Sequence, residues 1–196
     1  MQRSPNRRDP VPESSSDAEL LSAVARGDLG ALGILFDRHH VDVWRFLGRY
    51  LGRTSEDVDD IVQQTFLELP KIAGAFDGRA SCRSWLYGIA LRLAFRRRRS
   101  LARLRRMVSK LTETSKTTAG PDPEAIAEGR QDLMAFERAL GALGDKKRAA
   151  FVLVEIEGLS VDEAARALQI PAATVRTRTF HARQELRASM RKAGAL

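Results

Sequence analysis

Apolar residues recur at intervals of three and four positions along most of this chain, and that spacing constrains its fold more than any other feature. Two consecutive runs show it most clearly, at Leu32, Leu35, Phe36, Val43, Leu47, Tyr50, Val58, Ile61, Val62, Phe66 and Leu69. Such spacing gathers apolar side chains on one face of an α-helix. The alternation of period two that is typical of a strand, with turn residues around it, is missing from the sequence. The sequence therefore predicts an all-α fold.

A polar stretch divides the chain into two parts. Residues 108–121 are rich in Thr, Ser and Lys and show no periodicity, which is typical of a linker. Residues 17–107 and 122–196 each carry helical patterns, and residues 1–16 have the composition of a disordered tail. We therefore expect two small helical domains joined by a flexible linker.

Capping signals predict where several helices begin. Ser16 with Glu19 and Ser160 with Glu163 match the capping box, and Gly158 is placed to end a helix. Single acidic or hydroxyl residues are expected to cap further helices, at Asp28, Thr54, Asp122 and Asp145.

Composition restricts the classes of function. The 196 residues contain 33 Lys and Arg against 25 Asp and Glu, a formal charge of +8 that suits a polyanionic partner such as nucleic acid or an acidic membrane surface. A well-solvated surface explains the net charge equally well. No apolar run approaches the roughly 18 residues of a membrane span, and residues 1–16 lack the apolar segment of a signal peptide. These features predict a cytoplasmic protein without membrane insertion.

Chemistry-bearing residues do not form a recognisable catalytic or metal-binding pattern. Cys82 is the single cysteine, and no Cys/His cluster has zinc-ligand spacing. His39 and His40 are adjacent, and adjacent residues of a helix point apart. No nucleophile–base pair or phosphate-binding loop is evident. We expect no cofactor, no metal and no enzymatic activity.

Residues 160–187 predict a helix-turn-helix. A short helix over residues 161–168 is followed by Gln169-Ile170-Pro171 and a longer helix, and the second helix of such a motif enters the DNA major groove. Ala164 and Ala165 are small enough for close helix packing. Gln169 stands where positive φ is wanted, which predicts local strain. The alternative to a DNA-binding motif is an ordinary helical hairpin with a solvated basic face.

Charge changes abruptly within the first domain. Residues 54–77 contain six acids and one base, whereas residues 78–112 contain eleven bases and no acid. The acidic helix suits a protein partner, and the arginine-rich helix suits phosphates. Phe76, Trp85 and Tyr87 are placed to stack an unpaired base, although Trp85 also fits the core and Phe76 fits either role.

These segments resemble, in order, the parts of a known family. The segment D-V-D-D-I-V-Q-Q-T-F-L-E-L at residues 57–69 resembles the polymerase-binding helix of sigma factors, and F-D-G-R-A-S-C-R-S-W-L-Y-G-I-A at residues 76–90 resembles their −10 element reader. The helix-turn-helix resembles their −35 reader. Because the further domains of housekeeping sigma factors are missing, the resemblance is to the extracytoplasmic-function (ECF) group.

The resemblance implies three sets of site residues. Those implied to bind core polymerase are Asp57, Asp60, Gln63, Gln64 and Phe66. Those implied at the −10 element are Phe76, Asp77, Gly78, Arg79, Ala80, Ser81, Arg83, Trp85, Arg92 and Arg96. Those implied at the −35 element are Thr174, Arg176, Thr177, Arg178, Phe180, His181 and Arg183. Leu91-Arg92 and His181 depart from the family's usual Arg-Asn and Arg.

The implied function is to bind core RNA polymerase, through its clamp helices and flap, and to bridge both promoter elements while DNA melts. If the elements lie about two helical turns apart, the domains must sit ~70 Å from each other, which an extended linker of roughly 20 residues just spans. An anti-sigma factor is a plausible further partner. The alternatives are a stand-alone helix-turn-helix regulator, and a scaffold protein whose sigma-like surfaces bind only an inhibitor.

Overall fold

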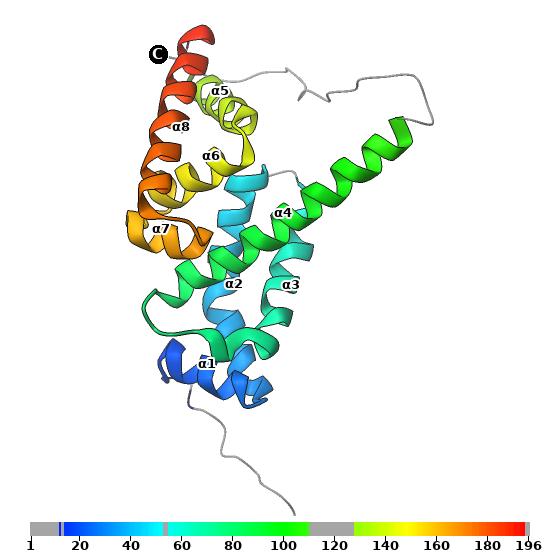
Figure 1. Cartoon of the computed structure of the whole chain (residues 1–196), viewed down its shortest axis with the longest axis vertical. Helices are drawn as coiled ribbons and strands as arrows, with labels where there is room; N and C mark the ends of the chain where they lie inside the picture. The colour runs from blue at the N-terminus through cyan, green and yellow to red at the C-terminus, as the bar shows by residue number, and fades with distance from the viewer. Residues whose placement is uncertain (1–11, 13, 53–54, 110–127, 195–196) are drawn as a thin grey trace, which may run out of the picture.

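The computed structural model describes residues 12, 14–52, 55–109 and 128–194, and all regular secondary structure within them is helical. An N-terminal module contains α1 (Asp17–Ala25), α2 (Leu29–Leu51), α3 (Asp57–Ile72), a short 3-10 turn η1 (Ala73–Ala75) and α4 (Cys82–Ser109). A C-terminal module contains α5 (Glu128–Ala142), α6 (Asp145–Phe151), a π-helical turn η2 (Val152–Ile156), α7 (Val161–Leu168) and α8 (Ala172–Lys192). Figure 1 shows the order of these helices.

The N-terminal module is built on the packing of α2, α3 and α4 against one another, with α1 across one end (Figure 1). Its centre is aromatic, because the rings of Phe46 and Tyr87 stack with centroids 4.2 Å apart. Leu47, Leu69 and Leu86 are fully buried around them. Most of the apolar residues that recur at helical intervals in the sequence face this core, whereas Phe36 is 38% exposed.

In the C-terminal module, α8 packs against α5, α6 and α7. Its buried side repeats at intervals of three and four residues, at Val175, Thr179, Ala182, Leu186 and Met190. The remaining positions of α8 point away from the module, and this leaves a long polar face.

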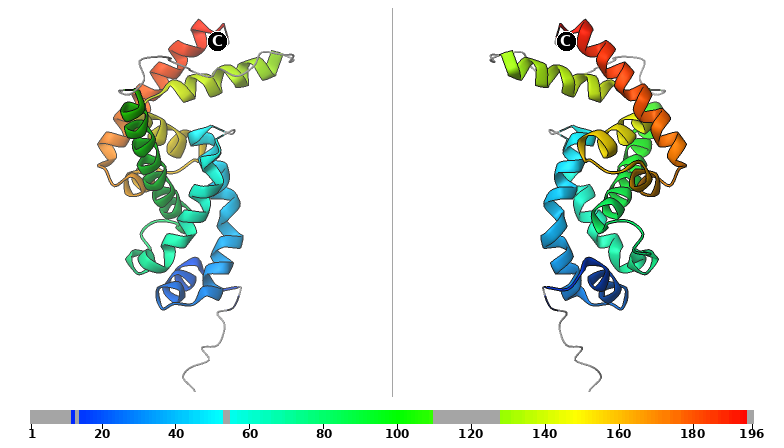
Figure 2. Two further views of the ribbon diagram at one scale, coloured as in Figure 1. Left: turned by 90° about the vertical axis from the view of Figure 1, so that its right-hand side faces the viewer. Right: turned by 90° about the vertical axis from the view of Figure 1, so that its left-hand side faces the viewer.

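The two modules are in contact. Helix α4 lies against α7, α2 contacts η2, and the buried residues of both modules form one continuous cluster. Figure 2 shows them stacked along the long axis of the molecule, with α1 at one end and α5 and α8 at the other. The two modules therefore pack together as one folded body.

The structure confirms the all-α expectation and most of the capping signals. Both capping boxes form, and Asp28 accepts hydrogen bonds from the backbone amides of Gly30 and Ala31. Gly158, with φ of 69°, follows Glu157, the residue that caps the end of the π-helical turn. Asp122 and Thr54 lie outside the described residues.

Three local expectations differ from the structure. Asp145 does not cap α6: Gly144 occupies the cap position, and the Asp145 carboxylate binds Arg98 instead. Gly74 and Gly78 lie close together and predict a loop over residues 73–79, but the structure begins this segment with the 3-10 turn η1. Helix α4 extends to Ser109, two residues into the predicted linker, because Arg, Leu and Ala favour helix in the absence of a stop signal.

Candidate nucleic-acid and polymerase interface

The helix-turn-helix is closed by a tight turn between α7 and α8. Gln169 adopts the left-handed conformation, with φ of 55° and ψ of 46°, and the amide of Ile170 donates to the carbonyl of Ala165 at 3.1 Å. The strain predicted for Gln169 is therefore confirmed, since a side chain in this region costs about 1–2 kcal/mol. The two hydrogen bonds from Ser160, to the carboxylate of Glu163, lower the pKa of that carboxyl.

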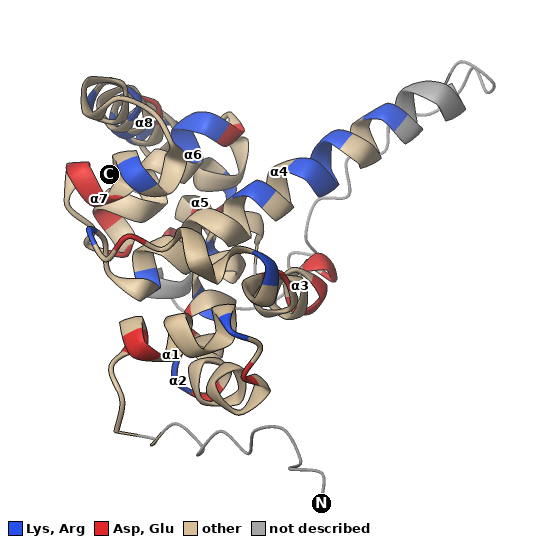
Figure 3. Ribbon diagram, turned by 60° about the horizontal axis from the view of Figure 1, so that its bottom comes forward, with Lys and Arg blue, Asp and Glu red and all other residues tan. Residues whose placement is uncertain are grey.

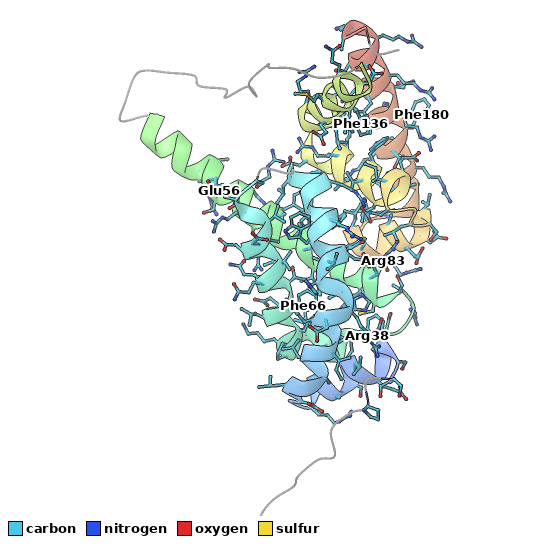
Figure 4. The ribbon with its side chains drawn as sticks, turned by 180° about the vertical axis from the view of Figure 1, so that it is seen from behind. Arg38, Glu56, Phe66, Arg83, Phe136 and Phe180 are labelled. Carbon is cyan, nitrogen blue, oxygen red and sulfur yellow. The ribbon has the colours of Figure 1, made fainter. Side chains whose placement is uncertain are left out.

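The outward face of α8 carries four of the predicted −35 residues. Arg176, Thr177, Phe180 and His181 all lie on the exposed side of the helix. Phe180 is 54% exposed, an unusual position for a large apolar ring, and Figure 4 shows it pointing away from the helices. Guanidinium, hydroxyl, imidazole and aromatic groups on one helix face form a surface that can donate to base edges and contact thymine methyl groups.

Contacts within the protein restrain four of the predicted −35 residues. Arg183 forms an ion pair with Glu155 at 2.5 Å, and this carboxylate raises the pKa of Arg183. Thr174 and Arg178 are half-buried at the edge of the exposed face. The hydroxyl of Thr177 donates to the carbonyl of Ala173 at 3.0 Å, so this group must turn to reach a base.

The predicted −10 residues over 76–81 form a connected loop before α4. Phe76 is half-buried and meets the ring of Trp85 edge-on, with centroids 5.4 Å apart. The Asp77 carboxylate accepts from the amide of Arg79, and Ser81 accepts from the amide of Ser84 at the start of α4. Gly78 lies exposed at the tip, while Ala80 is half-buried. Phe76 and Trp85 therefore fit both expectations, packing and base stacking. Each ring packs on the other, and each keeps a partly exposed surface.

Helix α4 presents its basic residues differently along its length. Arg92 and Arg96 are exposed, and the pKa of Arg92 is lowered by partial burial and then by the neighbouring Arg96 charge. Arg83 instead donates to the carbonyl of Glu157 in the C-terminal module at 2.9 Å. Figure 3 shows the basic residues following α4 and the acidic end of α3 beside them.

The acidic surface of α3 is partly engaged by α4. Arg97 lies 2.8 Å from Asp57 and 3.7 Å from Asp60, so one arginine of the basic run binds the acidic helix rather than solvent. Gln63 and Gln64 are exposed. Asp57, Asp60, Gln63 and Gln64 thus form a polar surface on α3, of which Arg97 occupies one part.

Phe66 does not lie on that surface. Its side chain is 4% exposed and meets Phe36 edge-on, with ring centroids 5.0 Å apart. Figure 4 labels its place among the helices of the N-terminal module. The expectation that Phe66 faces the polymerase conflicts with this burial. The physical reason is its position, because Phe66 shares the apolar face of α3 with Val62 and Leu69.

Sequence reasoning missed Leu67, which is 60% exposed on α3. It follows Gln63 by one helical turn, so it belongs to the polar face and adds an apolar contact to it. Its spacing of four residues from Gln63 could have indicated that it lies on the polar face. The apolar residues around it in the sequence made that spacing hard to recognise.

A pocket between the modules was also unpredicted. Its volume is about 640 Å³, and residues of α2, α5 and α6 line it. Trp44 and Leu133, both about half exposed, stand at its wall, and the indole of Trp44 donates to Asp59 at 2.9 Å. The pocket arises only where the modules meet, so no local sequence pattern marks it.

One mixed cluster brings together residues far apart in sequence. Ligand atoms of Asp17, His39 and Cys82 lie within 4.8 Å of one another. The Asp17 carboxylate is already bound by Arg38 at 3.0 Å and by His39 at 2.8 Å, an arrangement that ties α1 to α2. Burial, with a smaller contribution from Asp17, raises the pKa of the Cys82 thiol to about 12. His40 points elsewhere and stacks on Phe36, as expected for adjacent helical residues.

Within the described part of the chain, every helix is too short or too polar to cross a membrane.

Comparison with known proteins gives a consistent result for both modules. Residues 35–104 match the family model "Sigma-70 region 2", and residues 133–186 match "Sigma-70, region 4". The chain is 37% identical over 174 residues to the ECF RNA polymerase sigma factor SigM of Mycobacterium tuberculosis, which covers 87% of this chain and 83% of that protein. It is 30% identical over 183 residues to the ECF RNA polymerase sigma-E factor of Escherichia coli, covering 89% and 94%.

Solved structures resemble it over similar lengths. The structure of CnrH in complex with the cytosolic domain of CnrY matches with a TM-score of 0.63 and 29% identity, over 91% of this chain and 99% of that one. The sigma factor RpoE of Bartonella quintana, in complex with the anti-sigma factor NepR, matches with a TM-score of 0.59 and 20% identity, over 78% and 91%. The second likeness concerns the fold alone.

Proposed function

The chain belongs to the ECF group of RNA polymerase sigma factors, within the sigma-70 family, and we propose how its residues divide the work of such a factor. It is a promoter-specificity factor that binds core polymerase and recognises the −10 and −35 elements. The presence of both family regions on one chain leaves the stand-alone regulator without support.

We assign the −35 element to α8. The observation that carries this assignment is the exposed face with Arg176, Thr177, Phe180 and His181 on a helix whose opposite side is buried. Arg176 donates to a guanine edge, and Phe180 contacts a thymine methyl group. Thr174, Arg178 and Arg183 lie at the margins, where they suit phosphate contacts that position the helix.

We assign the −10 element to the loop before α4 and to the exposed arginines of α4. An extruded base would stack at the partly exposed Phe76 and Trp85 pair, which already offers two aromatic surfaces. Asp77, Gly78, Arg79, Ala80 and Ser81 surround it on one short loop. Arg92 and Arg96 follow on the outside of α4, where they suit the phosphates of the adjoining duplex.

We assign core polymerase binding to the exposed side of α3. Asp60, Gln63 and Gln64 supply polar contacts, with Leu67 as an apolar contact that an interface of this kind requires. Asp57 lies at the start of the same helix, where its ion pair with Arg97 holds its carboxylate in place. Phe66 supports this surface from beneath by packing in the core.

An anti-sigma factor is a further proposed partner. Two structural relatives were solved as complexes, and one of these complexes contains a named anti-sigma factor. The pocket between the modules, with Trp44 and Leu133 exposed at its wall, is an apolar surface that such a partner would cover.

The protein performs no chemistry in this proposal. Core polymerase forms the phosphodiester bonds, and the chain supplies recognition and strand separation. Its site of action is the cytoplasm, because core polymerase and promoter DNA are there.

The test is run-off transcription with core polymerase, purified protein and a pool of the host's promoter fragments. Wild-type protein should produce transcripts that start at discrete sites. Arg176→Ala and Phe180→Ala should reduce them at least about tenfold, because a bidentate base contact contributes about 1–3 kcal/mol of discrimination. The matched control is Arg187→Ala, which removes an exposed arginine of α8 that lies about three helical turns after Arg176, beyond the residues assigned to base reading.

Two results would contradict the proposal. Wild-type protein that yields no discrete transcripts would remove the sigma activity itself. Discrete transcripts that Arg176→Ala, Phe180→Ala and Arg187→Ala support equally would remove the assignment of the −35 element to this face.

A further inference from the structure

Three side chains that the proposed function does not use converge between α1, α2 and α4. Asp17 is the first residue of α1, His39 lies on α2, and Cys82 is the first residue of α4. One ligand atom from each lies within 4.8 Å of the other two. The expectation of no metal rested on spacing along the sequence, which cannot detect ligands that come from three helices. We propose that Asp17, His39 and Cys82 form a binding site for a divalent transition-metal ion, and that Zn²⁺ fits it best.

The ligand set has the chemistry that zinc prefers. Zn²⁺ is bound in proteins by thiolate, imidazole and carboxylate groups in a tetrahedron, and open sites keep three protein ligands with water in the fourth position. Ca²⁺ and Mg²⁺ require several oxygen ligands, whereas this cluster contains a single carboxylate. A thiolate from Cys82 and the carboxylate of Asp17 together balance the charge of a divalent ion. His39 adds a neutral nitrogen, which suits zinc and its neighbours among the transition metals.

The distances between the ligand atoms require only a small rearrangement. Bonds of about 2.0–2.3 Å to a tetrahedral zinc ion place its ligand atoms roughly 3.3–3.7 Å apart. In the structure Nε2 of His39 lies 2.8 Å from Oδ2 of Asp17, and every pair of ligand atoms in the cluster lies within 4.8 Å. The first pair must therefore open by about half an ångström, and the others must close by about an ångström. Side-chain rotation supplies movements of that size.

The surroundings hold the ligands in position and leave a way in. Cys82 is 5% exposed, while the side chains of His39 and Asp17 are 14% and 29% exposed, so an ion can enter beside the carboxylate. Arg38 donates to Oδ1 of Asp17 at 3.0 Å, and the other oxygen, Oδ2, is directed at His39. An outer contact of this kind orients a ligating carboxylate.

Metal binding must displace a proton from the site. Burial, with a smaller contribution from the Asp17 charge, raises the pKa of the Cys82 thiol, so the thiol holds its proton until a cation replaces it. A coordinating divalent ion deprotonates a thiol outright, and the proton passes to the buffer. His39 binds the ion through Nε2 as a neutral imidazole, in the tautomer that carries its hydrogen on Nδ1.

The site joins the start of α4 to the other helices of the N-terminal module. Cys82 directly follows Ser81, the last residue of the loop over residues 76–81, and α1 and α2 supply the other two ligands. A bound ion therefore cross-links three helices at the point where this loop meets α4. Binding stabilises the folded chain, because the unfolded chain does not hold the three ligands together.

The test measures metal binding by the full chain without an affinity tag. The sequence contains one cysteine and three histidines, so each candidate ligand can be tested singly. Reduced protein that has been stripped of metal is titrated with Zn²⁺ in a calorimeter, and separately with Co²⁺ in a spectrophotometer. We expect one Zn²⁺ per chain with a Kd below about 1 μM. Co²⁺ should give a thiolate-to-metal charge-transfer band and the intense visible bands of a tetrahedral site.

Two variants remove ligands, and a third is the matched control. Cys82→Ser and His39→Gln should each weaken Zn²⁺ binding by about 100-fold or more, since even outer contacts of a metal site are worth about 10–100-fold. His40→Gln should bind as wild type does, because its ring stacks on Phe36 instead. Zn²⁺ at about 100 times the wild-type Kd should raise the Tm of wild type and of His40→Gln by about 5–10 °C. The Tm of the two ligand variants should rise by less than about 2 °C.

Three results would overturn the site. The first is wild-type protein that binds Zn²⁺ more weakly than about 1 μM. The second is a Co²⁺ spectrum without the thiolate band, which decides the question even if a variant fails to fold, because Cys82 is the single cysteine. The third is folded Cys82→Ser and His39→Gln that bind as tightly as wild type. None of these measurements needs polymerase or DNA, so they are independent of the sigma activity.

Discussion

Two arginines of the C-terminal module show how differently one residue type is used. Arg148 on α6 is 5% exposed, donates to the carbonyls of Gly141, Leu143 and Tyr50, and lies over the Tyr50 ring. Arg176 on α8 is exposed on the reading face. The first holds backbone groups together and the second is available to DNA. The difference teaches that a basic residue in this chain is not evidence of DNA contact until its exposure is known.

The largest expected effect comes from breaking the buried member of this pair. Arg148→Ala leaves three carbonyls without their donor, and we expect the free energy of unfolding to fall by about 2–4 kcal/mol. Urea denaturation followed by circular dichroism measures it. Arg138→Ala, an exposed arginine on α5, is the control and should change the free energy by less than about 0.5 kcal/mol. Equal effects of the two variants would contradict the structural role of the buried Arg148.

Arg176→Ala should show the opposite profile. Its effect on unfolding should stay within about 0.5 kcal/mol, while discrimination at one base pair of the −35 element falls by about 1–3 kcal/mol. Competition binding of the polymerase complex to single-base variants of a promoter found by run-off transcription measures the second quantity. Uniform weakening across all base variants would assign Arg176 to a phosphate instead.

The helix-turn-helix that presents Arg176 depends on its cap. Ser160→Ala should lower the free energy of unfolding by about 1 kcal/mol, through loss of the first-turn hydrogen bonds of α7. The pKa of Glu163 is lowered in the folded protein, so its stabilising contribution is present above its unfolded pKa and is lost as pH falls through the lower folded value. Denaturation is measured at neutral and at acidic pH. The free energy of unfolding of Ser160→Ala should change less between the two than that of wild-type protein. An unchanged acid response would mean that the capping box contributes nothing to it.

The smallest expected effect concerns the turn itself. Gln169→Gly should raise the free energy of unfolding by about 0.5–1 kcal/mol, because glycine adopts the left-handed conformation without steric cost. Thermal denaturation resolves a change of this size as a rise of about 1–4 °C in Tm. A destabilised variant would show that the Gln169 side chain compensates for its backbone.

Sequence patterns predicted the helices well because their causes are local. The capping boxes at Ser16 and Ser160 and the left-handed Gln169 each depend on residues within a few positions. Asp145 shows where this reasoning stops. It looks like a helix cap, but a distant arginine from the other module takes its carboxylate.

The candidate sites divide in the same way. The exposure of Arg176 and Phe180 on one side of α8 was predictable, because they are one turn apart and opposite a buried stripe. Phe66 was expected to face the polymerase and Leu67 was given no role, whereas the structure buries Phe66 against Phe36 and exposes Leu67. A choice between neighbours of similar hydrophobicity needs the packing partner.

The sequence by itself determined the helical class, the division into two modules, the helix-turn-helix and the family resemblance, because periodicity, caps and turn chemistry act over short distances. Only the tertiary structure decided which charges are buried, which apolar residues are exposed and how the modules meet. Glu157 is the clearest example: nothing around it in sequence marks it, yet Arg49, Arg83 and Tyr87 converge on it from more than 60 residues away. Burial and long-range pairing depend on the relative placement of whole helices, which no local pattern contains.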